Sequence, residues 1–202
     1  MLARRMIIGG FAVAGMLAGV PAMAQVSLDV PAGDYKIDPR HTQILFGIKH
    51  MGLSTFWGRF AAVSGSLTFD PKAPEKSVLN VSIDMTNIQT HVPELDSDLP
   101  KSVFHADKFP TATFVSTQSV KASANTGTVT GNLTIAGVTK PVTLNVTFDG
   151  GRNSPMPLQP YRIGFDATTT IKRADFGLTG MIWSGLVGED VSLIIECELE
   201  KQ

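Results

Sequence analysis

The chain has 202 residues, a formal net charge of −1 at pH 7 and a single cysteine. The near-neutral charge, without a block of basic residues, argues against a nucleic-acid partner, and one cysteine excludes an internal disulfide. This length predicts one folded domain that can bury its core without covalent cross-links.

The first residues have the composition of an export signal. Arg4 and Arg5 precede an uncharged, mostly apolar stretch that is too short to span a bilayer comfortably, and the small-x-small site AMA follows at 22–24. We therefore expect residues 1–24 to be a signal peptide, residues 25–202 to form the mature domain, and the protein to reside in the periplasm. A buried N-terminal helix is the alternative, and the arginine pair leaves both the Sec and the twin-arginine route open.

Beyond this signal, alternation of apolar and polar residues dominates the sequence. A period of two places one face of each strand in a core and the other face in water. No further apolar stretch is long enough to cross a membrane. The predicted strands are 34–38, 44–50, 63–69, 79–85, 112–116, 129–135, 142–148, 163–171 and 191–199.

Two segments interrupt this pattern. Residues 50–60, HMGLSTFWGRF, form an unusually apolar connection that could hold one helical turn, and residues 92–110 are expected to carry one or two short helices broken at Pro100. Many antiparallel strands with little helix mean a sandwich or a closed barrel. Because closure removes exposed edges, we predict an all-β fold, a single antiparallel lipocalin-like β-barrel of about eight strands.

The interior of such a barrel can be solid or hollow. Gly65, Gly131 and Ala167 have inward parity, and small inward residues leave volume unless their neighbours fill it. A solid core that narrows along the barrel would also need small residues at these positions. The sequence therefore does not decide between a solid and a hollow interior.

The sequence offers little catalytic chemistry. It contains neither a G-x-S-x-G elbow nor an H-E-x-x-H zinc motif. Asp96 and Asp98 could form an acid–base pair, although helix capping and loop solvation are commoner roles for such carboxylates. Cys197 has the apolar parity of the last strand, which favours a small core side chain over a nucleophile. Four histidines lack metal-binding spacing, although the fold could still cluster them: His41, His50, His91 and His105. We therefore expect no catalytic residue, no metal and no cofactor.

The apolar segment HMGLSTFWGRF could form the mouth of a cavity. Phe56, Trp57 and Phe60 would make a lip that admits an apolar chain, and His50 or Arg59 would meet its polar end. A plug over the barrel end, with Arg59 in an internal ion pair, is the alternative. Strand residues of inward parity complete the expected site, because a closed barrel turns them to a common interior. The expected ligand-binding residues are Phe46, Ile48, His50, Phe56, Trp57, Arg59, Phe60, Leu67, Phe69, Val81, Ile83, Phe114, Leu144, Val146, Phe165 and Ile195.

Several stretches together are similar to one known family. They cover about residues 34 to 200 and read YKIDPRHTQILFGIKHMGLSTFWGRF, GSLTFDP, FPTATFVST, GNLTIAGVTKPVTLNV, IKRADFGL and VGEDVSLIIECEL. The sequence resembles the YceI-like family of lipocalin-like periplasmic proteins that bind polyisoprenoids. The resemblance implies a barrel around a long apolar cavity. It also implies that the cavity binds, sequesters or transports an isoprenoid quinone or polyprenyl phosphate without catalysis.

The chain departs from the family pattern in two places. The insert LDSDLPKSVFHADKFP lacks the histidine that the family usually carries between its Asp and Leu, so no role is transferred to that position. The stretch GLTGMIWSGLVGED is richer in large apolar residues than the family pattern predicts.

Other functions stay open. An enzyme or redox partner that holds a quinone or similar amphiphile would need titratable groups at the cavity, for which His50, His105, Asp96 and Asp98 are the candidates. A fatty acid or fatty amide also combines a long tail with a small head, and a solid barrel would bind no ligand. A homodimer is also left open.

Overall fold

The computed structural model describes residues 27–179 and 185–202. The expected signal peptide, residues 1–24, lies outside the described residues. Within them the protein is an all-β barrel with one α-helix and short 3-10 turns, as the alternation predicted. Among the helices of this described part, none combines the length and apolar character that crossing a membrane requires.

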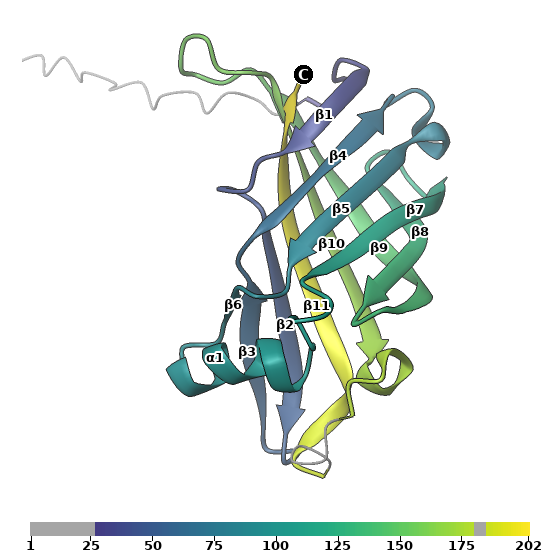
Figure 1. Ribbon diagram of the computed structural model, residues 1–202. Coiled ribbons are helices and arrows are strands. Elements are labelled where there is room, and N and C mark those ends of the chain that lie inside the picture. The colour runs from purple at the N-terminus through teal and green to yellow at the C-terminus, as the bar shows by residue number, and fades with distance from the viewer. Residues whose placement is uncertain (1–26, 180–184) are drawn as a thin grey trace, which may run out of the picture.

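Eight antiparallel strands close into the predicted barrel (Figure 1). Their order is β1-β4-β5-β7-β8-β9-β10-β11, and β1 pairs back onto β11 to complete the ring. A closed ring satisfies strand edges that an open sheet would expose. The bounds are β1 Gly33–Ile37, β4 Val63–Phe69, β5 Val78–Asp84, β7 Thr111–Lys121, β8 Thr126–Ile135, β9 Val138–Arg152, β10 Arg162–Lys172 and β11 Val187–Lys201.

Three further strands extend the wall at one end of the ring. β2 (Gln43–His50) continues along β11 where β1 stops, β3 (Ser54–Phe60) pairs with β2, and β6 (Ile88–Gln89) pairs with β3. The long strand β11 therefore has β1 beside its C-terminal end and β2 beside the rest. The wall is continuous across the break between β1 and β2.

The segment predicted to connect two strands is itself largely a strand. Met51 and Gly52 have positive φ angles of 51° and 73°, as in the tight primed turns that join antiparallel strands, and β3 begins at Ser54. The prediction of an apolar connection is therefore wrong. It failed because the large apolar Trp57 lies on the outer face, where it packs over Gly47.

The insert at 92–110 forms one helix, α1 (Pro93–Ser102), which continues through the buried Pro100 rather than breaking there. Proline at its first position presets the backbone for a helix. The carboxylate of Asp96 accepts hydrogen bonds from the backbone N and the Oγ1 of Thr90, at 2.7 and 2.6 Å. These bonds fix the start of α1 to the chain that leaves β6.

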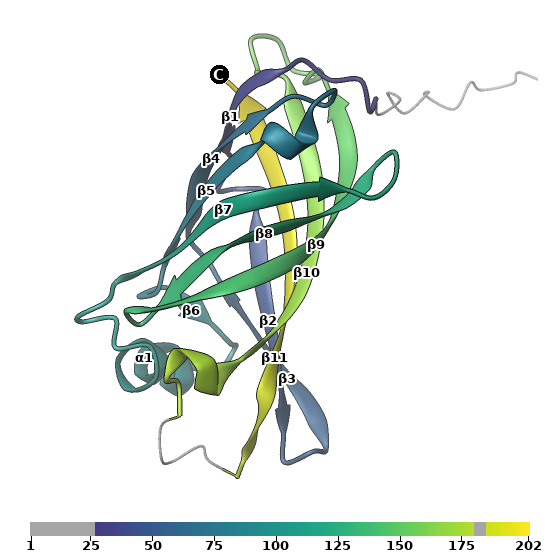
Figure 2. The same ribbon diagram turned by 90° about the vertical axis from the view of Figure 1, so that its right-hand side faces the viewer.

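The barrel has two unlike ends. α1 and the 3-10 turn η2 (Arg173–Phe176) lie at one of them. The 3-10 turn η1 (Pro74–Lys76) and the β7–β8 hairpin lie at the other (Figures 1 and 2). We call these the α1 end and the η1 end, and both belong to the same tube of strands.

Aromatic rings fill part of the interior at each end. At the α1 end, Phe60 and Phe104 meet edge to face with their ring centroids 5.9 Å apart. At the η1 end, Phe69, Phe148 and Phe165 all contact one another, with centroid distances of 4.9 to 5.6 Å. Such contacts stabilise aromatic pairs beyond simple burial, so they hold the wall together around the space between them.

Candidate ligand-binding cavity

The barrel encloses a long cavity of about 880 Å³. Small-molecule sites typically span ~300–1,000 Å³, so this one is large. Its wall includes residues of all eight barrel strands, together with β2, β3, α1 and the η1 turn. The small residues Ala112 and Ala167 are among those that line it. The interior is therefore hollow, which decides between the two interiors that the sequence left open.

Most of the residues predicted for the site do line this cavity, because alternate residues of each strand share the inner face. Those brought together there are Phe46, Ile48, His50, Phe56, Phe60, Leu67, Phe69, Val81, Ile83, Phe114, Leu144, Val146, Phe165 and Ile195. Whether they contact a ligand stays a prediction.

The structure corrects the predicted positions of Trp57 and Arg59. Both lie on the outer face of β3, because Phe56 and Phe60 occupy the inward positions of that strand. Trp57 is 44% exposed. Arg59 donates from Nε to Oε1 of Gln89 at 2.8 Å, on the neighbouring strand β6. Neither the predicted lip residue nor the predicted head-group cation faces the cavity.

Side chains of α1 close the wall at the α1 end. Leu95, Leu99 and Val103 recur every four residues and line the cavity together with Phe104. Residues at this spacing share one face of a helix, so the periodicity of the insert could have identified them. The insert therefore covers the tube rather than presenting catalytic carboxylates.

A buried arginine fastens the same end. Arg173 donates from Nε to the carbonyl of Gly188 at 3.0 Å, from Nη1 to the carbonyl of Leu178 at 2.9 Å, and from Nη2 to Oε1 of Glu189 at 2.7 Å. Arg173 and Leu178 are both buried and line the cavity. The guanidinium thereby ties the chain after β10 to the start of β11.

The remaining titratable candidates from the sequence do not assemble a catalytic site. Asp98 accepts a hydrogen bond from Ser102 Oγ at 2.7 Å within α1, and Asp96 binds Thr90. His105 is exposed and is not among the residues that line the cavity, whereas His50 does line it. Of the four residues named for the enzyme alternative, His50 is the one that lines the cavity.

Cys197 lines the cavity between these ends. Burial raises the pKa of its thiol to about 11, although a hydrogen bond from Thr42 Oγ1, 3.7 Å from the sulfur, opposes this rise. A thiol with this pKa is protonated at neutral pH, and the thiolate is the reactive form. The structure therefore confirms the interpretation of Cys197 as a small core side chain.

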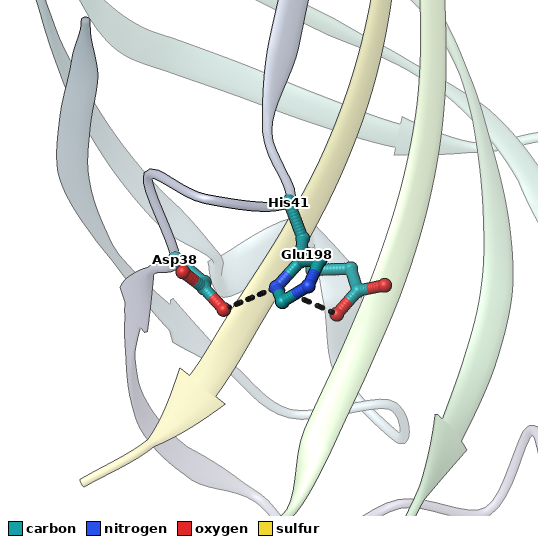
Figure 3. Close-up of side chains that lie close together, drawn as sticks. All are labelled: Asp38, His41 and Glu198. Atoms are coloured by element: carbon teal, nitrogen blue, oxygen red, sulfur yellow. Dashed lines mark hydrogen bonds and ion pairs between the residues drawn. The ribbon is translucent and has the colours of Figure 1, made fainter.

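Three potential metal ligands meet on the barrel wall where β1 gives way to β2. Asp38, His41 and Glu198 lie close together (Figure 3). His41 Nδ1 is 2.6 Å from Asp38 Oδ2 and 3.9 Å from Glu198 Oε2. Arg162 already occupies the position of a cation, with Nη1 2.6 Å from Asp38 Oδ2 and 3.1 Å from Glu198 Oε2. This cluster is an ion-pair network with its own positive charge.

The network holds Asp38 strongly ionised. Burial alone would raise its pKa, but hydrogen bonds from His41, Arg162 and the backbone N of Arg40 bring the pKa of this carboxyl well below its usual range. Asp38 also donates its backbone N to the carbonyl of Glu198 at 2.9 Å. The cluster thus fastens the break between β1 and β2 to β11, outside the cavity.

Comparisons with known proteins show which family shares this sequence and fold. The model of the YceI-like domain matches residues 35–199. A UPF0312 protein of Pseudomonas aeruginosa is 41% identical over 170 residues, which cover 83% of this chain and 86% of that protein. A UPF0312 protein of Yersinia enterocolitica is 43% identical over the same share of each chain.

Solved structures agree. BcnA of Burkholderia cenocepacia matches with a TM-score of 0.71 at 25% identity, over 80% of this chain and 98% of that one. The YCEI protein of Campylobacter jejuni matches with a TM-score of 0.67 at 32% identity, over 76% and 90%. A polyisoprenoid-binding domain from Saccharophagus degradans shares the fold at 16% identity, with a TM-score of 0.62 over 85% of this chain and 100% of that one. From the closed barrel, its cavity and these matches, we conclude that this chain belongs to the YceI-like family.

Proposed function

We propose that this protein binds a long-chain isoprenoid lipid in the barrel cavity and sequesters or transports it in the periplasm without chemical change. The observation that carries this proposal is the cavity itself. It extends from the η1 turn to α1 and is lined mainly by apolar side chains. A long, narrow apolar guest is the ligand that such a tube can enclose along its length.

Burial of an apolar tail supplies the affinity. Each Å² of apolar surface that leaves water contributes about 25 cal/mol, and the association is non-directional. A polyisoprenoid tail needs no precisely placed polar partners, in accord with the aliphatic and aromatic lining. The fold neighbour from Saccharophagus degradans is described as polyisoprenoid-binding, which supports the same class of ligand here.

The periplasmic location rests on the leader composition. An arginine pair, an apolar stretch and a small-x-small cleavage site precede residue 25. Determination of the N-terminus of the protein purified from a periplasmic fraction checks this part. The expected N-terminus is Gln25, and recovery of Met1 in the exported protein would contradict it.

Solvent extraction of the natively purified protein, followed by mass spectrometry, tests the ligand class. We expect a stoichiometric isoprenoid lipid in the extract. The matched variants are Val146→Trp, which fills the cavity, and Asn145→Trp, which adds the same ring to the exposed face of β9.

The lipid should be lost from Val146→Trp and retained by Asn145→Trp. Equal lipid content in both variants, with both folded, would show that the cavity is not the binding site. Conversion of the lipid during incubation would favour the enzyme alternative.

A further inference from the structure

Polar groups on the cavity wall gather at the η1 end. The α1 end is lined chiefly by the aliphatic and aromatic residues of α1, β2 and β3. The η1 turn and the β7–β8 hairpin instead contribute hydroxyl, amide and ammonium groups. The polar lining residues from these two segments are Lys72, Ser77, Ser119, Lys121, Ser123, Asn125, Thr126 and Thr128. The tube is therefore polarised along its length.

The cavity also reaches solvent at this end. Lys72, Lys121, Ser123 and Ala124 are exposed, yet they line it. At the α1 end, Arg173 and Leu178 are buried and the lining residues of α1 are half-buried, and Ser54 is the exposed lining residue among those of β2, β3 and α1 that the structure describes. A lipid that enters tail first from the η1 end would leave its head among the polar groups of the β7–β8 hairpin and the η1 turn (Figure 2).

The charged residues that line the cavity at this end are two lysines and one aspartate. Lys72 follows β4 and Lys121 ends β7, so the ammonium groups come from two separate elements of the rim. Neither lysine takes part in the ion pairs of the described residues. Asp29 is the acidic residue that lines the same end. The η1 segment also carries Asp70, Glu75 and Lys76, none of which lines the cavity. The two lysines are therefore the cations that face the cavity at this end.

We propose that the η1 end binds the head of the lipid, and that this head is an anion, a phosphate or a carboxylate, held by Lys72 and Lys121. This inference rests on the proposed function, because it assigns an orientation and a head group to the same ligand. An anionic oxygen forms hydrogen bonds with the lysines in which both partners are charged, whereas in a bond to a neutral quinone carbonyl only the donor is charged. The tail extends toward α1.

The test compares ligands that share a tail but differ in head. Farnesyl phosphate and farnesol are titrated against a fluorescent polyprenyl analogue, with palmitate as the carboxylate arm and inorganic phosphate as the head alone. For the wild type we expect farnesyl phosphate or palmitate to bind about tenfold or more tightly than farnesol, a difference of about 1.4 kcal/mol. The stronger arm identifies the head as phosphate or carboxylate.

Paired charge variants locate the site. The double variant Lys72→Gln/Lys121→Gln should lose the preference for the anion and bind farnesol like the wild type. The control Lys36→Gln/Lys140→Gln removes the same charge from exposed outer positions and should keep the preference.

Two results overturn the inference and differ from failure of the proposed function. Equal affinity of the wild type for farnesol and both anions would exclude an anionic head. A preference that persists in Lys72→Gln/Lys121→Gln but disappears in His50→Gln would place the head at the α1 end. In both cases isoprenoid binding itself survives, whereas no binding of any isoprenoid would refute the proposed function.

Discussion

The two ends of this barrel are built from the same eight strands but differ in chemistry and in closure. At the α1 end, a helix lays aliphatic side chains over the tube and the buried Arg173 ties its connecting chain to β11. At the η1 end, exposed lysines and hydroxyl residues of the β7–β8 hairpin line the opening. An apolar end covered by α1 and a polar end with several exposed lining residues give the cavity a direction.

The largest expected effect on stability comes from removing the hydrogen bonds of Arg173 at the α1 end. Arg173→Ala leaves the carbonyls of Leu178 and Gly188 and the carboxylate of Glu189 without their donor. Each buried partner left unpaired costs about 1–3 kcal/mol, so we expect a loss of about 3 kcal/mol in the free energy of unfolding, measured in urea. Lys121→Ala at the η1 end should leave unfolding unchanged. Equal destabilisation by both variants would mean that the two ends do not differ in rigidity.

The next test concerns the wall between the two ends. Asp38→Asn removes the charge that Arg162 and His41 neutralise, and should lower the free energy of unfolding at pH 7 by about 2 kcal/mol. The native state holds the pKa of Asp38 below its unfolded value. Its stabilisation is therefore present above about pH 4, the unfolded value, and is lost as the pH falls below it.

Urea unfolding from pH 7 down to pH 2 checks this dependence on pH. The difference between the wild type and Asp38→Asn should shrink as the pH falls below about 4. A difference that stays constant across this range would show that the network contributes packing rather than charge.

A sharper comparison uses two neighbouring aromatic residues on opposite faces. Phe56 lines the cavity near the α1 end, whereas Trp57 lies outside over Gly47. Phe56→Ala should weaken binding of a polyprenyl tail by about 1–2 kcal/mol, because it removes apolar contact area, while Trp57→Ala should leave binding unchanged. Displacement titrations on both variants measure this, with thermal melts as the control for folding. If only Trp57→Ala weakens binding, Trp57 contacts the ligand at the mouth of the cavity, as the sequence predicted.

The smallest expected effect lies on the outer wall, where neither end is involved. Burial and the charge of Asp166 raise the pKa of Asp149, and a hydrogen bond that protonated Glu196 donates to Asp166, followed by burial, raises the pKa of Glu196. A raised native pKa of a carboxyl means that stability falls as the pH rises from about 4, the unfolded value, through the native one. Asp166→Asn should therefore stabilise the protein by about 0.5 kcal/mol at pH 7, since these exposed charges are screened.

The same variant should give little gain at pH 4, where the wild-type carboxyls take up protons. Unfolding in urea at the two pH values measures both. Ligand binding should not change in Asp166→Asn, because this carboxylate lies outside the cavity. A loss of stability at pH 7 would instead show that Asp166 makes a favourable contact with its neighbours.

Much of the candidate site could be predicted before the fold was known. Leu144 and Val146 alternate with Thr143 and Asn145, and this pattern placed the apolar residues inside as predicted. The same reasoning wrongly placed Trp57 at the cavity. Hydrophobicity alone does not show that its indole packs over a glycine of the neighbouring strand on the outer face. The α1 residues were missed because the insert was interpreted as broken at Pro100.

The sequence by itself determined the eight strands of the ring and β2, most of their inward faces and the family, because local alternation and motif order are written along the chain. Only the tertiary structure decided that β1 closes onto β11, that the interior is hollow, and that Lys72 and Lys121 line one end of it. These features depend on the register between strands distant in sequence. That register follows from how all the strands pack around one axis, so no single segment specifies it.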